Sequence, residues 1–270
     1  MRATPISRNQ EILLQQISEP FALGNSIIHS MHPGFRLACA FLFSIAGALL
    51  TNLTAAGSVL AAGILFSIAA RLNFKHLLKR LLIVNFFILF LWIFLPFSKP
   101  GTPVFNVGPF NATLEGITYT AIITLKSNGI LLAITALVAT MPVQTLGSAM
   151  QSLKIPDKLC RLLLFSWRYV HVMMTEYTRM RRAAAMRAFK PRTNLHTYRT
   201  YSWLLGMLLV RSMDRAHRVW QAMLCRGFNG TFHTLSSYKT GKRDLTLLAV
   251  TAACVTVFIS LEFNIIEVSL

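Results

Sequence analysis

Long apolar stretches recur along the chain, with short polar segments between them. Five stretches come close to the roughly 17–25 residues that an α-helix needs to cross the hydrocarbon core of a bilayer. They cover residues 35–50, 55–70, 81–97, 116–141 and 245–261. The first two must borrow flanking residues to span, and the short uncharged turn between them predicts a helical hairpin. The pattern indicates an all-α integral membrane protein with about five transmembrane helices.

The segment 143–243, between the fourth and fifth stretches, has helical rather than strand periodicity. A short helix is expected over 143–153, and Pro156 ends it. Asp157 then stands in the N-cap position of a long helix. The apolar stripe of this helix is wide, so we expect it to lie against the membrane-embedded part or against another helix.

A second long helix is expected over about 198–226, after a break at Pro191. Apolar residues recur along it at roughly helical spacing, and Gly227 is well placed to end it. Two long helices joined by a short connector predict a crossed or antiparallel pair.

Charged residues on these two helices are expected to support the pair. Glu176 falls within the stripe of the first helix, while Arg211, Arg215 and Arg218 line one face of the second. Asp214 can pair with Arg218, because residues four apart are neighbours on a helix surface.

The distribution of charge predicts the orientation of the chain in the membrane. Only 13% of residues are charged, against about 25% in soluble domains, yet the formal net charge is +18. The segment 143–243 holds five Lys and thirteen Arg against three acidic residues. The loop 98–111 has one Lys, and no Lys or Arg follows the last stretch. Basic segments stay in the cytoplasm, so five spans from a cytoplasmic N-terminus fit every segment.

This topology predicts a protein of the bacterial inner membrane that consists of four parts. They are a cytoplasmic leader (1–34), a four-helix transmembrane region (35–141), a cytoplasmic two-helix domain (142–243), and a last transmembrane helix with an external C-terminus (244–270).

Lys126 lies in the middle of the fourth stretch. An ionisable residue at that depth is costly and suggests a functional site. We favour a structural role, with the lysine facing the bundle near Thr124, Ser127 and Asn128, because costly membrane charges often simply face the protein interior.

The residues needed for several kinds of catalysis are missing. Gly241-Lys242-Arg243 lacks the first Gly and the Ser/Thr of a P-loop, so it is not a nucleotide-binding motif. No His/Cys cluster has metal-ligand spacing, and the four cysteines form no C-x-x-C pair. The spans hold no paired carboxylates, nucleophile elbow or H-E-x-x-H. We therefore expect a non-catalytic protein that binds no metal or cofactor itself.

The two long helices end in similar sequences. Residues 183–189 read AAAMRAF and residues 222–228 read AMLCRGF, so Arg187 and Arg226 hold equivalent places. Each Arg could simply face the negative C-terminal end of its own helix. The repetition favours instead a partner with two equivalent acidic pockets.

These endings resemble the paired Ala-Arg-Gly motifs of the transmembrane T component of energy-coupling factor transporters. The stretch 186–230 is most similar to the CbiQ branch, which serves cobalt and nickel uptake, and residues 25–33 (NSIIHSMHP) resemble the pre-span leader of that family. The first ending has Met-Arg-Ala and the second Cys-Arg-Gly. Because Ala188 lacks the φ freedom of Gly, the first helix is expected to end less sharply.

The resemblance implies a coupling role. It implies two long helices that rest on two ATP-binding cassette subunits, which hold ATP and Mg²⁺, and a separate substrate-binding membrane S component of the cobalt or nickel type. It places Arg187 and Arg226 in grooves of the ATPases, with Met186, Ala188, Cys225 and Gly227 beside them.

Two alternatives remain from the sequence. The same coupling role could serve a vitamin such as biotin, because cargo binding belongs to another subunit. The basic segment could also bind nucleic acid, but the positive-inside rule explains its charge and no recognised nucleic-acid module is present. We therefore expect the lipid bilayer and transporter subunits, not nucleic acid, as partners.

Overall fold

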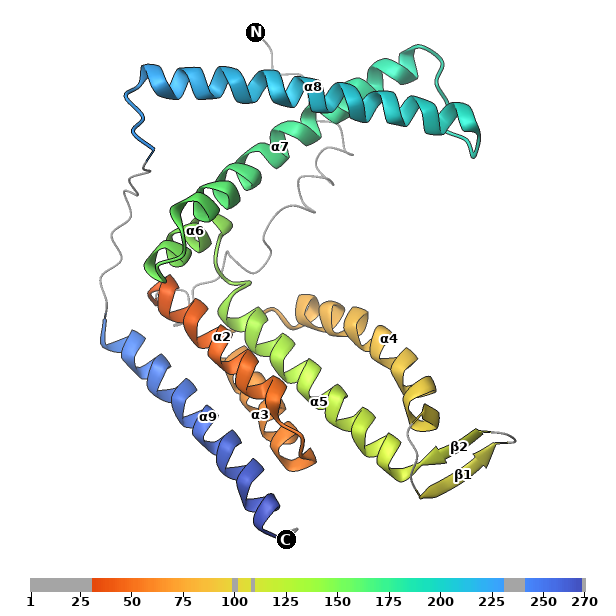
Figure 1. Cartoon of the computed structure of the whole chain (residues 1–270), viewed down its shortest axis with the longest axis vertical. Coiled ribbons are helices and arrows are strands. Elements are labelled where there is room, and N and C mark those ends of the chain that lie inside the picture. The colour runs from red at the N-terminus through yellow and green to blue at the C-terminus, as the bar shows by residue number, and fades with distance from the viewer. Residues whose placement is uncertain (1–30, 99–101, 108–109, 231–240, 269–270) are drawn as a thin grey trace. The chain divides into compact units, whose positions relative to one another are not determined.

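Nearly all the ordered elements are helical. The computed structural model describes residues 31–98, 102–107, 110–230 and 241–268, and these form eight helices and two short strands (Figure 1). The elements are α2 (Pro33–Leu49), α3 (Leu53–Ala69), α4 (Phe74–Ser98), β1 (Pro103–Val107), β2 (Phe110–Thr113), α5 (Leu114–Leu137), α6 (Val143–Ser152), α7 (Asp157–Met186), α8 (Leu195–Cys225) and α9 (Lys242–Val268). The predicted helical membrane protein is confirmed. Most of the predicted leader, 1–34, lies outside the described residues.

The chain divides into two compact units. Residues 1–153 and 238–270 form one, which we call the membrane unit, and residues 154–237 form the other, the crossed-helix unit. The boundaries predicted for the cytoplasmic domain, 142–243, refer to the membrane surface and stay a prediction.

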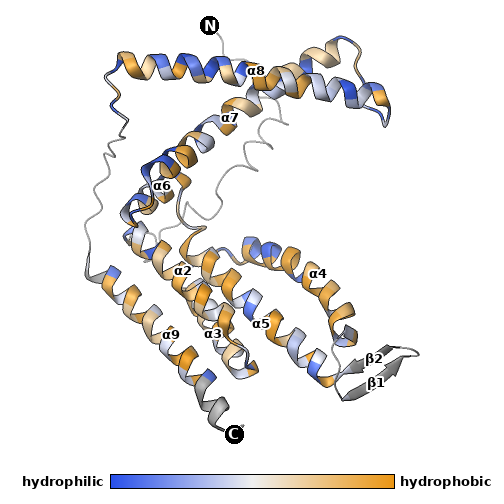
Figure 2. Ribbon diagram, in the orientation of Figure 1, coloured by the Kyte–Doolittle hydropathy of each residue, from blue (hydrophilic) through white to orange (hydrophobic). Residues whose placement is uncertain are grey.

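Among the described residues, three helices are long and apolar enough to cross a bilayer. They are Phe74–Ser98, Leu114–Leu137 and, within α9, Asp244–Glu262; Figure 2 shows their apolar character. The helices α2 and α3 are also apolar but have 17 residues each. A helix of that length measures about 25 Å, against a hydrocarbon core of about 30 Å. The five-span topology therefore remains a prediction.

Two glycines bring α3 and α5 into backbone contact. A Cβ on Gly63 would lie 2.5 Å from the carbonyl oxygen of Gly129, and one on Gly129 would lie 2.8 Å from the backbone of Val59 and Leu60. Small residues permit such close approach of helices in lipid. Gly57, on the same helix α3, makes no such close approach, since nothing lies within 4 Å of a Cβ there.

The core of the membrane unit forms where α2, α3 and α9 meet. The ring of Phe43 is fully buried. It makes edge-to-face contacts with Phe66, at 5.7 Å, and with Phe258, at 5.5 Å. Aromatic pairs favour this geometry, so one residue of α2 fixes the position of both neighbours.

Two carboxylates attach α9 to the two ends of α2. Asp244 accepts a hydrogen bond of 2.7 Å from the backbone N–H of His32, just before α2. Glu262 accepts one of 2.9 Å from the N–H of Thr51, just after α2. The two acids are 18 residues apart, about 27 Å along a helix, which matches the length of α2. Each one pairs a backbone donor that a helix end leaves free.

Lys126 makes polar contacts that the sequence did not predict. Its Nζ donates a hydrogen bond of 3.0 Å to the carbonyl of Ala48, in the last turn of α2. The carboxylate of Glu262 provides a nearby opposite charge. The lysine thus faces other helices as expected, but its contacts differ from the three neighbours on α5 that were proposed.

A β-hairpin replaces the irregular loop expected after the third apolar stretch. The strands β1 and β2 pair antiparallel, with Asn106 opposite Asn111. Two strands are marginal by themselves, and this pair is followed directly by α5, whose N-cap Thr113 accepts a hydrogen bond of 3.2 Å from the N–H of Gly116.

Replacement of Gly63 by Ala is expected to destabilise the membrane unit. The added methyl group must push α3 away from α5, and overpacking of this kind costs about 1–3 kcal/mol. Gly57→Ala on the same helix is the matched control, because its methyl group meets open space. Thermal unfolding of both variants in detergent would measure the difference. Equal midpoints would contradict the proposed close contact.

Candidate functional site

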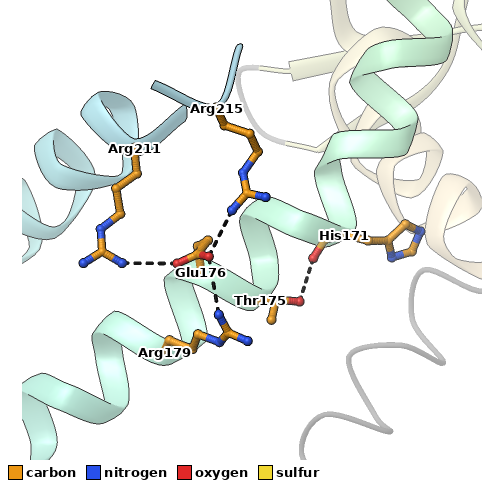
Figure 3. Close-up of polar contacts among 6 residues, drawn as sticks. All are labelled: His171, Thr175, Glu176, Arg179, Arg211 and Arg215. Carbon is orange, nitrogen blue, oxygen red and sulfur yellow. Dashed lines mark hydrogen bonds and ion pairs between the residues drawn. The ribbon is translucent and has the colours of Figure 1, made fainter. Parts of the chain in front are cut away.

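The two long helices of the crossed-helix unit are joined through one carboxylate. Glu176 of α7 contacts two arginines of α8, at 3.2 Å for Arg211 and 3.1 Å for Arg215 (Figure 3). Arg179, one turn along α7, adds a longer ion pair of 3.6 Å. The side chain of Glu176 is 13% exposed, so this carboxylate lies under the three guanidinium groups at the crossing point.

Five residues were predicted from the sequence to support the helix pair, and they lie differently in the structure. The structure brings Glu176, Arg211 and Arg215 together. Asp214 and Arg218 are both exposed, and the ion pairs found among the described residues all involve Glu176. The expected pair between Asp214 and Arg218 is therefore absent, because the two side chains extend into solvent, where an ion pair gains little.

The starts of the helices differ slightly from the sequence prediction. Asp157 is the first residue of α7 rather than its N-cap, which is Pro156. The N-cap of α8 is Asn194, and the helix begins at Leu195, three residues before the predicted start. Neither N-cap side chain bonds to its helix. The negative charge of Asp157 still lies at the positive end of the α7 dipole.

The two helices end in the same hydrogen-bonded geometry. At the end of α7, the N–H of Arg187 donates to Ala184 and the N–H of Phe189 also donates to Ala184, at 3.0 and 3.1 Å. At the end of α8, Arg226 and Phe228 repeat this pattern on Met223, at 3.0 and 3.1 Å. The residue after each Arg adopts a positive φ, as a left-handed helix cap requires.

The expectation of a less sharp first ending is wrong. Ala188 has a φ of 59° and Gly227 a φ of 74°, so both chains turn equally. This left-handed conformation is unfavourable for Ala, because it costs an L-residue roughly 1–2 kcal/mol. Such strain persists where the surrounding structure demands it. Phe189 helps to hold this conformation through ring contacts with Tyr201 and His196 of α8, at centroid distances of 5.9 and 6.1 Å.

Both arginines are open to a binding partner. Arg187 and Arg226 are exposed, as are Cys225 beside the second and Met186, 91% exposed, beside the first. The two endings lie at opposite ends of the crossed pair (Figure 1). A guanidinium can form two parallel charge-assisted bonds with a carboxylate. The unit thus presents two equivalent cationic contacts at a fixed separation.

An apolar groove lies beside the second ending. It has a volume of about 640 Å³ and runs between the first half of α7 and the last half of α8. Its walls include Phe165, Tyr169, Met213, Trp220 and Phe228. Phe228 packs edge to face on Trp220 at 6.2 Å, so the residue that follows the helix end also closes one side of the groove.

Comparison with known proteins assigns the chain to a family. The family model described as CbiQ, cobalt transport protein, matches residues 24–237. The chain belongs to the CbiQ family. The matched range contains both long helices and both of their endings.

Two relatives agree with this family. The chain is 27% identical, over 88% of its length and 94% of the relative, to the energy-coupling factor transporter transmembrane protein EcfT of Leuconostoc gelidum subsp. gasicomitatum. It is 29% identical to the nickel permease LarQ of Lactiplantibacillus plantarum, over 41% of this chain and 40% of the relative. This CbiQ-family chain is a multi-pass, non-catalytic transmembrane T component of energy-coupling factor transporters.

The interhelical bridge is the feature that sequence reasoning only partly found. Glu176 is the single acidic residue in α7 after Asp157, surrounded by arginines, and that isolation was the available signal. The partner helix of Glu176 could not be read from spacing, because ion pairs between helices depend on the crossing geometry.

Loss of the charge on Glu176 is expected to loosen α7 from α8. Glu176→Gln keeps the shape but leaves Arg215, whose Nε is already buried without a partner among the described atoms, without its anion. Because the arginines are partly exposed, we expect a loss of about 1–2 kcal/mol, measured as lower midpoints of thermal unfolding and faster amide exchange in α8. Asp214→Asn is the matched control and should stay within about 0.5 kcal/mol. If both variants matched the parent, Glu176 would not hold the pair.

Proposed function

We propose that this CbiQ-family chain transmits the movements of two cytoplasmic ATP-binding cassette subunits to a substrate-binding membrane S component. The observation that supports this is the repeated ending of α7 and α8, with one exposed arginine and one left-handed turn at each. Two equal contacts suit a partner made of two similar ATPase subunits, which carry the ATP and Mg²⁺.

The rigidity of the crossed pair makes such transmission physically reasonable. A helix end seated in a pocket moves with that pocket as a rigid body. Glu176 ties α7 to α8 near their crossing, so closure of an ATPase pair would change the angle between the helices or turn both together. The cap at Ala188 fixes the backbone turn that follows Arg187, so that little backbone order has to be gained on binding.

We further propose that α7 and α8 lie in the cytoplasm, with the N-terminus on the same side and the C-terminus outside, in a bacterial inner membrane. The excess of basic residues in 143–243 supports this orientation. ATPase subunits that use cellular ATP act on that side, so the two proposals agree.

We propose a divalent transition-metal ion, cobalt or nickel, as the cargo of the complete transporter. The family description names cobalt and one relative is named a nickel permease. In the coupling role proposed here, selection of the ion belongs to the S component; in the described residues, no group of three or more His, Cys, Asp or Glu side chains could hold a metal ion. Uptake of labelled cobalt, nickel and biotin by the assembled complex would separate these cargoes.

Removal of both terminal arginines is expected to stop transport. Each charge-assisted contact contributes about 1.5–3 kcal/mol, so Arg187→Ala together with Arg226→Ala should lower uptake by at least about tenfold while the protein still inserts. The matched control is Arg181→Ala together with Arg199→Ala, two exposed arginines on the same two helices. Normal uptake with both terminal arginines removed would disprove the coupling role.

The native cysteines offer a direct test of where the ATPases bind. Cys225 is exposed beside Arg226, whereas Cys160 is buried, and burial, followed by the charge of Asp157, raises the pKa of the Cys160 thiol. A maleimide should therefore label Cys225 rather than Cys160 at neutral pH, because the thiolate is the reactive form.

Addition of the ATPase pair should protect Cys225 from the maleimide. An engineered Thr102→Cys in the exposed start of the hairpin is the control and should react equally with and without ATPases. Undiminished labelling of Cys225 in a transport-active complex would place the ATPases elsewhere.

A further inference from the structure

A second groove lies within the membrane unit, between α3 and α4. Both helices pack along α5 and hardly contact each other, which leaves a space of about 560 Å³. Its walls are mostly apolar, with Ile64 and Ile68 from α3 and Leu77 and Leu81 from α4. Such apolar walls suit an apolar chain as the occupant of the groove.

The polar atoms at the deep end of the groove are already paired. Asn85 and Asn128 donate to each other's side-chain oxygens at 3.2 and 3.0 Å, and Ser67 donates to the carbonyl of Gly63 at 2.9 Å. These groups therefore need no hydrogen bonds from an occupant. The deep end accepts a hydrocarbon chain without an unsatisfied polar atom, which would be costly in lipid.

The rim of the groove is cationic. Arg71 lines it where α3 ends. Lys75 and Lys79 are exposed on the next turns, and residues 31–98 contain no Asp or Glu. Arg71 makes no ion pair within the described part of the chain. Because α3 and α4 contain no carboxylate, an anion that neutralises this positive rim must come from outside these two helices.

The backbone holds Arg71 in place at this rim. Its φ is 48°, and its N–H donates to Ile68 at 3.0 Å while that of Leu72 donates to Ser67 at 3.4 Å. This is the left-handed cap that usually carries Gly. An arginine in such a position is strained, and the turn places Arg71 at the groove, where it is one of the lining residues.

The depth of the groove matches one leaflet of a bilayer. Leu60 at the deep end of α3 is 11 residues from Arg71, and Asn85 is 11 residues from Phe74 at the rim. At 1.5 Å per residue both helices give a depth of about 16 Å, close to half of the roughly 30 Å hydrocarbon core. An occupant with its charge at the rim would thus end near the middle of the membrane.

We propose that this groove binds one anionic phospholipid, with an acyl chain between α3 and α4 and its phosphodiester against the guanidinium of Arg71. Basic pockets between transmembrane helices bind lipid headgroups in this way. In the orientation proposed above, the lipid belongs to the cytoplasmic leaflet, whose surface is rich in anionic lipids. The site lies wholly within the membrane unit and does not depend on the ATPase contacts.

The headgroup contact can be tested by native mass spectrometry of the full chain. Protein taken from nanodiscs of equal phosphatidylglycerol and phosphatidylcholine should retain mainly phosphatidylglycerol. Arg71→Gln should reduce that retention about fivefold, the factor expected for one cation near the lipid surface. Arg80→Gln, which removes a cation of α4 that neither lines the groove nor belongs to its rim, should reduce it less than twofold. Equal losses of lipid retention in the two variants would show that only the general surface charge matters, and would refute the proposed site.

The acyl-chain contact has its own matched pair of variants. Ile64→Trp should fill the groove and abolish retention, whereas Leu65→Trp on the neighbouring, more exposed position outside the lining should leave it unchanged. Equal retention of the two lipids, persistence of the lipid in Ile64→Trp, or a protein segment crosslinked to position 64 in place of lipid would each refute the proposal. Loss of transport in Arg187→Ala with Arg226→Ala leaves these measurements unaffected, so the two proposals fail separately.

Discussion

The carboxylate of Glu176 is the contact on which the crossed-helix unit depends. Two helices of 30 and 31 residues share few buried side chains, so their angle must be fixed by polar contacts at one place. Glu176 accepts from Arg211 and Arg215 of the other helix. A carboxylate with three arginines around it offsets its desolvation through charge-assisted bonds, and removal of that carboxylate leaves the arginines without their anion.

In the membrane unit, the backbone N–H and C=O groups at the helix ends need hydrogen-bond partners other than water. Asp244 and Glu262 accept backbone N–H groups on either side of α2, and Lys126 donates to a free carbonyl at the end of the same helix. The three charges therefore serve the backbone of α2 and the turn after it. These hydrogen bonds explain how ionisable residues are accommodated in an apolar unit. The core of that unit contains Phe43 and several alanines, and its helices approach closely at glycines.

Strained caps recur where the chain presents an arginine. Ala188 follows Arg187 with a positive φ, and Arg71 itself adopts one. The cost of the left-handed conformation in L-residues would be avoided by Gly, as at Gly227. Each strained cap places an exposed arginine at the end of a helix, and in both places the proposed partner is anionic.

The sequence by itself determined the helical class, the membrane character, the family and the matching endings of α7 and α8. Hydrophobic period, charge asymmetry and short motifs are local properties, and they are read along the chain. Only the tertiary structure decided which charged residues pair: Glu176 binds Arg211 and Arg215, and the expected pair between Asp214 and Arg218 does not form. It also decided that Gly63 and Gly129, rather than Gly57, form the close contact between helices. In the same way, it decided that Lys126 lies near Ala48 and Glu262. Each of these contacts joins residues far apart in sequence, and the crossing angle and rotation of each helix, which no local pattern encodes, decide which side chains meet.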